Sequence, residues 1–195
     1  MVGQKQHHLS DKSQSEKPLI YNIYESSPDN SARFLLGKKG SPSIMVIGLN
    51  PSIADQQTSD ITASKIERIA ALNGYKGFVI ANLYPLRSTQ PDNLPHSADM
   101  GLIEDNVKRI RQFCEEQGYN QFWAAWGTNI VKRDYLQDSF LRLDELVKNL
   151  QGRWISYGAL LKFGHPRHPS RASYSSGFNN FCSLTYSSQL PGLKK

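Results

Sequence analysis

The stretch Ser43–Leu49, with the sequence SIMVIGL, is an unbroken apolar run that ends at Asn50-Pro51-Ser52. An apolar run of this kind, without polar alternation, is typical of a strand covered on both faces, as in a parallel sheet. Three later segments repeat the pattern: Gly77–Leu83 (GFVIANL), Gln121–Trp126 (QFWAAW) and Arg153–Tyr157 (RWISY). Successive runs start roughly 30–45 residues apart, which leaves room for a crossover helix between parallel strands. We therefore predict a three-layer α/β/α domain with a central four-stranded parallel sheet.

Helical periodicity fills the gaps between these strands. Capping residues and glycines give the expected bounds of three helices: Asp60 or Thr62 to Asn73–Gly74, Asp99 to Gly118, and a third near Ser139–Leu150. Ahead of the first strand, Leu19–Tyr24 and Arg33–Leu36 flank the turn sequence SSPDN, which predicts an N-terminal β-hairpin.

The two ends of the chain differ in composition from its middle. Residues 1–17 are polar and predict a disordered tail, residues 18–175 form a single α/β domain, and 176–195 predict an irregular C-terminal tail. No apolar run approaches the roughly 20 residues that a membrane-spanning helix needs. The N-terminus also lacks the apolar stretch of a signal peptide. We therefore expect a cytoplasmic protein with no membrane partner.

The formal net charge of +6 is unevenly placed. After Glu145 the sequence contains no Asp or Glu, but it contains Lys148, Arg153, Lys162, Arg167, Arg171, Lys194 and Lys195. This segregation favours an anionic partner such as nucleic acid or a nucleotide. The two cysteines, Cys114 and Cys182, are too few for an iron–sulfur cluster or a four-cysteine zinc site, and they do not indicate a disulfide framework.

Polar and aromatic side chains gather where the four predicted parallel strands end. Because ligands bind outside the carboxyl ends of the strands in open parallel sheets, we expect these loops to form one site. The candidates are Asn50, Pro51 and Ser52 after the first strand, Asn82, Tyr84 and Arg87 after the second, Trp126 and Asn129 after the third, and Arg167, His168, Ser170 and Arg171 after the fourth.

Several classes of enzyme are disfavoured because their motifs are missing. The sequence has no G-x-x-x-x-G-K-[ST] phosphate loop and no G-x-G-x-x-G, which argues against nucleoside triphosphatases and dinucleotide enzymes. It has no G-x-S-x-G nucleophile elbow either. His165 and His168 stand beside prolines without a third ligand at an obvious spacing. We therefore expect no cofactor and no metal.

The residue types that remain suit a nucleobase. An asparagine amide donates and accepts at once, so it can match a base edge or orient a water molecule. An imidazole can donate to a developing anion. Arginines bind phosphates, and aromatic rings stack on bases.

Two resemblances add to this interpretation. Residues 32–171 resemble the bacterial and phage family catalogued as domain of unknown function 1643, which implies no activity. The matching pieces are IGLNPSIAD (47–55), SDIT (59–62), ANLYPLRSTQP (81–91), D-x-G-x-x-x-D-N (99–106), AAWGTN (124–129) and GHPRHP (164–169).

The order of four short motifs is also similar to that of the uracil-DNA glycosylase superfamily. There, a first strand ends in G-Q-D-P-Y or G-I-N-P-G, a second in an asparagine and a third in L-W-G, and a late loop carries H-P-S. The corresponding pieces here are Gly48–Ser52, Asn82, Trp126-Gly127 and His168-Pro169-Ser170. The resemblance implies a glycosylase-like fold.

The second resemblance also implies roles for individual residues. Asn50 would orient the attacking water, Asn82 would read the base edge, and His168 would donate to the base oxygen as the glycosidic bond breaks. Asn50 stands where the fastest members have a carboxylate, so no general base is obvious. Arg171-Ala172 stands where those enzymes carry an apolar wedge, which favours a single strand, an RNA or a free nucleotide over intact duplex DNA.

The leading hypothesis is therefore a protein that recognises a nucleobase, nucleotide or nucleic acid and hydrolyses an N-glycosidic bond. Three alternatives stay open at this point. They are a non-catalytic nucleic-acid-binding module, an enzyme acting on a small nucleotide or sugar, and a protein-interaction role in phage or mobile-element biology.

Overall fold

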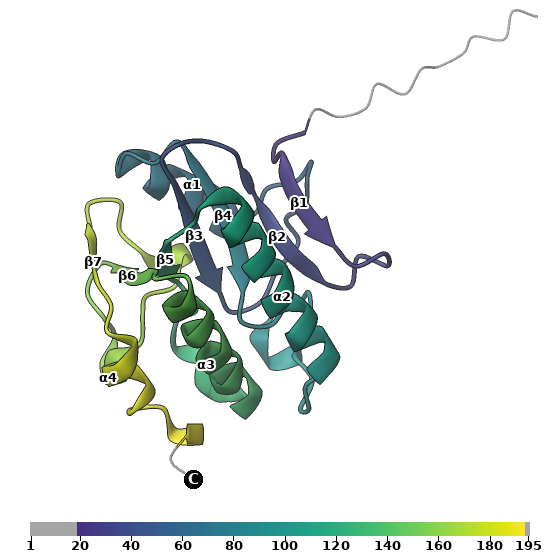
Figure 1. Ribbon diagram of the computed structural model, residues 1–195, viewed down its shortest axis with the longest axis vertical. Coiled ribbons are helices and arrows are strands. Elements are labelled where there is room, and N and C mark those ends of the chain that lie inside the picture. The colour runs from purple at the N-terminus through teal and green to yellow at the C-terminus, as the bar shows by residue number, and fades with distance from the viewer. Residues whose placement is uncertain (1–18, 194–195) are drawn as a thin grey trace, which may run out of the picture.

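The computed structural model describes residues 19–193 of the chain. Within them, one seven-stranded sheet has the order β1-β2-β4-β3-β5-β6-β7 (Figure 1). The strands are β1 (Ile23–Ser26), β2 (Arg33–Lys38), β3 (Ser43–Gly48), β4 (Gly77–Asn82), β5 (Gln121–Ala124), β6 (Arg153–Tyr157) and β7 (Phe178–Asn180).

The four middle strands are parallel, and strands at both edges are antiparallel to them. β4, β3, β5 and β6 are the four apolar runs of the sequence, and neighbouring pairs among them run in parallel. On one side β2 pairs antiparallel with β4, and on the other β7 pairs antiparallel with β6. The prediction of a four-stranded parallel sheet with a separate hairpin is therefore corrected to one mixed sheet, because the hairpin extends the sheet edge beside β4.

The helices are α1 (Ile61–Leu72), α2 (Met100–Gln117), α3 (Asp134–Asn149) and α4 (Ser183–Ser187). Asp60 caps α1, where its Oδ1 accepts from the backbone N–H of Ala63 at 2.8 Å. Asp99 caps α2 in the same way, and Gly118 ends it with a left-handed φ of 71°. Both caps follow the sequence prediction. The third helix begins earlier than predicted, at Asp134 rather than near Ser139.

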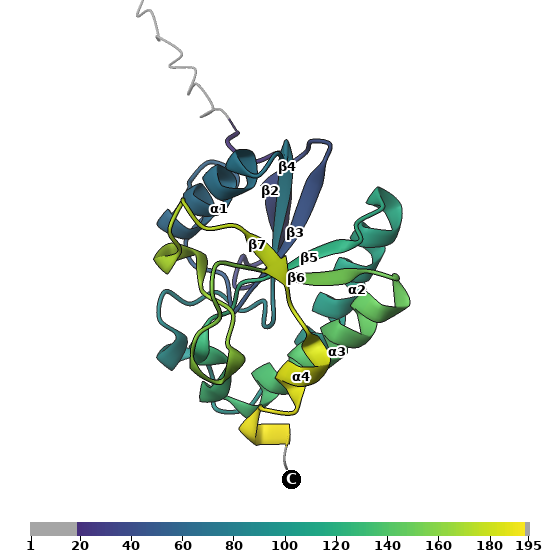
Figure 2. The same cartoon turned by 90° about the vertical axis from the view of Figure 1, so that its left-hand side faces the viewer.

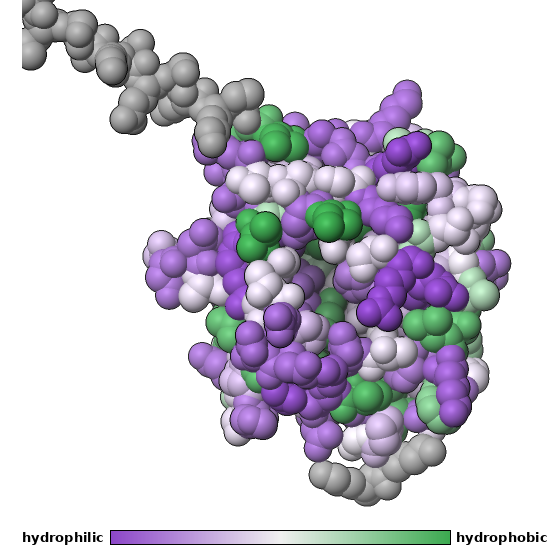
Figure 3. Space-filling model, turned by 180° about the vertical axis from the view of Figure 1, so that it is seen from behind, coloured by the Kyte–Doolittle hydropathy of each residue, from purple (hydrophilic) through white to green (hydrophobic). Residues whose placement is uncertain are grey.

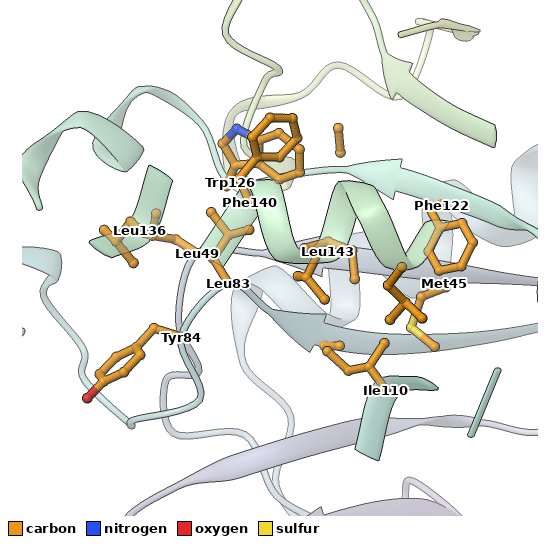
Figure 4. Close-up of a cluster of buried hydrophobic side chains, with 14 of the residues drawn as sticks. Met45, Leu49, Leu83, Tyr84, Ile110, Phe122, Trp126, Leu136, Phe140 and Leu143 are labelled. Carbon is orange, nitrogen blue, oxygen red and sulfur yellow. The ribbon is translucent and has the colours of Figure 1, made fainter. Parts of the chain in front are cut away.

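The helices lie on both faces of the sheet (Figure 2). From β3 the chain crosses to β4 on one side, and from β4 it crosses back past β3 to β5. Because crossovers are right-handed, this reversal places α1 on one face and α2 and α3 on the other. On the α2 and α3 face, Met45, Ile110, Phe122 and Leu143 belong to one buried cluster (Figure 4).

The C-terminal segment is part of the folded unit. The prediction of an irregular tail over 176–195 is wrong for β7 and for α4. Phe181, Tyr186 and Leu190 are buried in the cluster on the α3 side. The strand has only three residues and no apolar alternation, so no periodic signal marks it.

The predicted tail over 1–17 lies outside the described residues. Within 19–193, no helix combines the length and the apolar character needed to cross a membrane.

Candidate functional site

A cleft of about 520 Å³ lies on the α1 side of the sheet, at the carboxyl ends of the parallel strands. It opens on the side of the molecule shown in Figure 3, where a hollow is visible between polar and apolar side chains. β3 and β5 are neighbours whose following helices lie on opposite faces, and this is where open α/β sheets bind ligands. Nine of the predicted site residues line the cleft: Asn50, Ser52, Asn82, Trp126, Asn129, Arg167, His168, Ser170 and Arg171.

The floor of the cleft is made from small residues. Gly48, the last residue of β3, is paired with Asn82 of β4. A Cβ atom on Gly48 would lie only 2.7 Å from Oδ1 of Asn82. The glycine therefore leaves the space that the Asn82 side chain uses. Ala125 continues the floor beyond β5, and Ala63 and Ile66 of α1 form an apolar wall.

Asn82 carries an unused donor at the bottom of this space. The residue is 2% exposed, and its Nδ2 is buried without a hydrogen-bond partner among the described residues. A buried unpaired donor costs free energy, because water no longer satisfies it. A ligand that presents an acceptor here would remove that cost.

Asn50 has a fixed amide orientation. Its Nδ2 donates to the carbonyl oxygen of Pro51 at 3.0 Å and to that of Ser88 at 2.8 Å. Both partners accept only, so the amide nitrogen must face them and Oδ1 must face away. These bonds also fasten the loop after β3 to the loop after β4. The oxygen is left as an acceptor at the cleft.

His168 is held as a neutral donor. Its Nδ1 accepts from the backbone N–H of Ser170 at 3.3 Å and lies 2.8 Å from the hydroxyl of the same residue. With Nδ1 accepting, the ring proton sits on Nε2. Burial lowers the pKa of His168, as does the charge of Arg171, while Asp60 acts in the opposite direction.

The loop after β5 packs closely on this histidine. Gly127 has a left-handed φ of 73°, and a Cβ atom there would lie 3.2 Å from Cβ of His168. On the other side, Nζ of Lys65 in α1 donates to the carbonyl oxygen of Ser170 at 3.0 Å. The His168 segment is therefore held between α1 and the end of β5.

Asp60 is the acidic residue among those that line the cleft. One of its oxygens caps α1, as described above. Its charge acts on both His168 and Arg33. The cationic residues Arg167 and Arg171 lie in the loop after β6 and line the same cleft. The charge of the cleft lining is therefore predominantly positive.

Arg33 was missed by the sequence analysis, which treated it only as part of the hairpin. It starts β2, is 3% exposed and lines the cleft. Its Nη1 donates to the carbonyl oxygen of Ala54 at 2.8 Å, whereas Nε is buried without a partner among the described residues. Burial, together with the nearby charge of Arg87, lowers the pKa of Arg33 to about 10, so it stays charged at neutral pH. The sequence signal that could have indicated a buried arginine is its position directly before the apolar run FLL.

Four further polar residues of the cleft were not among the predicted site residues. They are Thr62 at the start of α1, Ser88 and Thr89 after β4, and Thr128 after β5. Each belongs to a loop or helix end that was expected at this rim, but hydroxyl residues are common in such loops and gave no distinct signal.

Two of the predicted ligand contacts, Arg87 and Tyr84, have structural partners instead. Nη1 of Arg87 donates to the carbonyl oxygens of Ser52 and Ala54, and Nη2 donates to the hydroxyl of Tyr24. Tyr84 is buried, and its hydroxyl accepts from the backbone N–H of Asp99. These two residues and the buried Pro51 are not among those that line the main cleft.

The ring of Trp126 is not available for stacking. It is 1% exposed and packs among the rings of Phe140, Trp154, Phe181 and Tyr186, with Phe140 beside it in Figure 4. The ring therefore packs on the core side of the sheet, and the prediction that Trp126 contacts a ligand has no support from an exposed ring face.

His165 is structural, in agreement with the position of the H-P-S motif at His168. It is 5% exposed, and its Nδ1 lies 2.9 Å from the hydroxyl of Tyr186. Within residues 19–193, no three His, Cys, Asp or Glu side chains lie close enough together to hold a metal ion.

Comparison with known families gives a match. Residues 33–170 match the family described as Protein of unknown function (DUF1643). The chain belongs to this family. No curated protein and no solved structure matches it. The matched part of this DUF1643 protein begins at Arg33 and ends at Ser170, and both residues line the cleft.

Proposed function

We propose that the cleft binds a nucleobase of a single-stranded nucleic acid or a nucleotide and hydrolyses its N-glycosidic bond. The observation that carries this proposal is the unpartnered Nδ2 of Asn82 at the bottom of a space with apolar walls. A base is flat and apolar on its faces and polar at its edge, so it complements a slot with Ala63, Ile66 and Ala125 along it and an amide at its end.

Two side chains, His168 and Asn50, act directly on the base and on the attacking water. As the bond between the sugar and the base nitrogen breaks, its electron pair leaves with the base. Nε2–H of His168 donates to the base, where the negative charge develops. Oδ1 of Asn50 accepts a hydrogen bond from the water whose oxygen attacks the anomeric carbon. The water loses one proton, the departed base gains one, and the products are a free base and a sugar with a new hydroxyl.

Asp60 supplies the negative charge for the sugar. An asparagine amide is not a base, so Asn50 orients the water and does not deprotonate it. The sugar becomes positively charged as the base departs, and a carboxylate at the cleft stabilises that charge. The proton leaves the water after the new bond has formed, when the water oxygen is strongly acidic.

Arg167 and Arg171 bind the phosphates on either side of the base. Both lie in the loop after β6 and line the cleft with the larger part of its positive charge. Affinity for a polynucleotide should therefore fall steeply with salt concentration. The similar order of four motifs in the uracil-DNA glycosylase superfamily supports the same assignment.

The test is base release from single-stranded oligonucleotides with different natural, deaminated and damaged bases, together with the matching free nucleotides. We expect release from at least one substrate by the wild type and its loss in Asn50→Ala and His168→Ala. The matched controls are Asn179→Ala and His96→Ala, which change exposed residues of the same types. Full activity of both Asn50→Ala and His168→Ala would contradict the assigned roles.

A non-catalytic binding module is the second candidate. It is favoured by the presence of a single carboxylate at the cleft, one oxygen of which already caps α1. Salt-dependent binding of oligonucleotides by the wild type, without release of any base, would select this candidate over the enzyme.

A further inference from the structure

Arg33 is a buried cation without a carboxylate partner. The ion pairs formed among residues 19–193 do not include it. Its Nη1 donates to a neutral carbonyl oxygen, that of Ala54. Burial, followed by the like charge of Arg87, lowers the pKa of Arg33, while the charge of Asp60 acts in the opposite direction without forming an ion pair with Arg33. A charge removed from water in this way is costly unless an anion meets it.

The position of Arg33 places this cation at the deep end of the cleft. β2 pairs antiparallel with β4, with Leu36 opposite Ile80, and the backbone N–H of Arg33 donates to the carbonyl oxygen of Pro85. Arg33 therefore lies beside the carboxyl end of β4, where Asn82 is. Nε of Arg33 and Nδ2 of Asn82 are two buried donors without partners in one cleft.

This depth decides between a phosphate and a base. Arg33 is 3% exposed, so the phosphates of a strand that runs across the mouth of the cleft do not reach it. Arg167 lies at the cleft with a larger exposed fraction and suits those phosphates better. The group that meets Arg33 must itself enter the cleft, and in the proposed complex that group is the base.

We propose that Arg33 is a further catalytic residue, which binds an oxygen of the base and stabilises the negative charge as the base departs. This inference rests on the proposed function. A guanidinium fixed in a site that excludes water stabilises a developing anion without reorganisation during the reaction. Asn82 donates to the same edge, and His168 donates from the loop after β6.

The proposal specifies a substrate class. The two unpartnered groups are both donors, so the buried edge of the base must present acceptors. A base with a keto group places an oxygen there, and its anion carries charge on that oxygen. An edge that presents only an exocyclic amine would leave a donor facing a cation. We therefore expect keto bases as substrates, with water as the co-reactant and the free base as the product.

The decisive test compares two leaving groups. A keto-base substrate and its fluorinated derivative differ in the acidity of the base, because fluorine withdraws electrons and makes the anion more stable. With Arg33→Met, we expect the single-turnover rate to fall about 10²-fold on the ordinary base. The loss of rate should be much smaller on the fluorinated base, because its anion is already more stable and depends less on stabilisation by Arg33. Arg33→Lys, which keeps a charge, should have a rate on the ordinary base between that of the wild type and that of Arg33→Met.

Equal losses on both substrates would overturn the catalytic role, because a change in structure alone affects both alike. Wild-type release of base with equal losses in Arg33→Met refutes this inference and leaves the proposed function standing. Absence of base release by the wild type from every substrate refutes the proposed function.

A binding measurement covers the case in which no Arg33 variant folds. The affinity of the wild type for the free fluorinated keto base, which loses its proton at a lower pH than the ordinary base, should increase as the pH rises through that range, where Arg33 with its pKa of about 10 is still charged. An affinity that stays flat, or falls, would overturn the inference without any variant.

Discussion

The indole Nε1 of Trp126 donates to the hydroxyl of Tyr186 at 3.0 Å, across 60 residues of chain. The same hydroxyl lies 2.9 Å from Nδ1 of His165, and burial raises the pKa of Tyr186 well above its usual range. Tyr186 thus accepts from the indole and is also hydrogen-bonded to the imidazole. One hydroxyl joins α4, the end of β5 and the loop after β6.

Tyr186→Phe should lower the free energy of unfolding by about 1–3 kcal/mol, because it leaves two buried polar groups without a partner. Chemical denaturation, followed by tryptophan fluorescence, measures this directly. Tyr174→Phe is the control, since its ring is 40% exposed and keeps its contacts with Lys65 and Arg68. A stability loss in Tyr174→Phe as large as that in Tyr186→Phe would contradict the assignment.

Gly48→Ala should impair the cleft itself. The new Cβ would lie 2.7 Å from Oδ1 of Asn82, so the Asn82 side chain must move away from the floor. We expect a stability loss of about 1–3 kcal/mol from overpacking and a loss of ligand affinity. The readouts are a denaturation curve and a binding titration with single-stranded oligonucleotides.

The control for this change is Gly177→Ala, because a Cβ atom there meets nothing within 4 Å. That variant should keep both stability and affinity. Unchanged affinity in Gly48→Ala would show that the position of the Asn82 amide does not matter for binding.

Asp60 allows its charge to be separated from its capping role. Asn and Asp are comparable N-caps, so Asp60→Asn should keep the stability of the fold, whereas Asp60→Ala should lose about 1 kcal/mol. Both substitutions remove the negative charge at the cleft. We expect both to slow base release to a similar degree.

Thermal or chemical denaturation and a single-turnover assay of base release give the two numbers for each variant. Retention of activity by Asp60→Asn would mean that the carboxylate acts only as a cap. Activity that is lost only in Asp60→Ala would lead to the same conclusion.

The two histidines of the loop after β6 make stability depend on pH. Burial lowers the pKa of His165 and of His168 below the ordinary 6.5. As the pH falls below that ordinary value, the two histidines become protonated in the unfolded chain while they are still neutral in the folded chain. The stabilisation is therefore present above the ordinary pKa and is lost as the pH falls towards the lowered values.

Denaturation curves at about pH 7.5 and about pH 5 should show a lower free energy of unfolding in acid. His165→Gln should reduce this difference, because one of the two groups is then removed. His96→Gln, which changes an exposed histidine, should leave it unchanged. A free energy of unfolding that is equal or higher in acid would exclude the burial effect.

The parallel part of the sheet could be predicted because its strands are apolar throughout and regularly spaced. Helix ends could also be predicted from Asp60, Asp99 and Gly118, since each of these residues acts on backbone groups of its own helix. The join between the hairpin and β4 could not be predicted. Whether β2 pairs with β4 depends on contacts between distant segments that no local pattern encodes.

The loops that form the candidate site could be predicted from the sequence, but the direction in which each side chain points could not. Asn50, Asn82 and His168 line one cleft, as the convergence of strand ends implied. Trp126 was assigned to the ligand although its ring faces the aromatic cluster, because a single residue at a strand end can point to either face. Arg33 was missed since its strand had not been placed beside β4.

The matched family range ends at Ser170, while β7 begins at Phe178. β7 therefore lies outside the range that matches the family, and it pairs with the edge of β6 that would otherwise be exposed. In any relative without a counterpart of β7, the N–H and C=O groups along that side of β6 would be open. Such a chain would be prone to self-association by strand pairing, or would need a partner strand supplied from elsewhere.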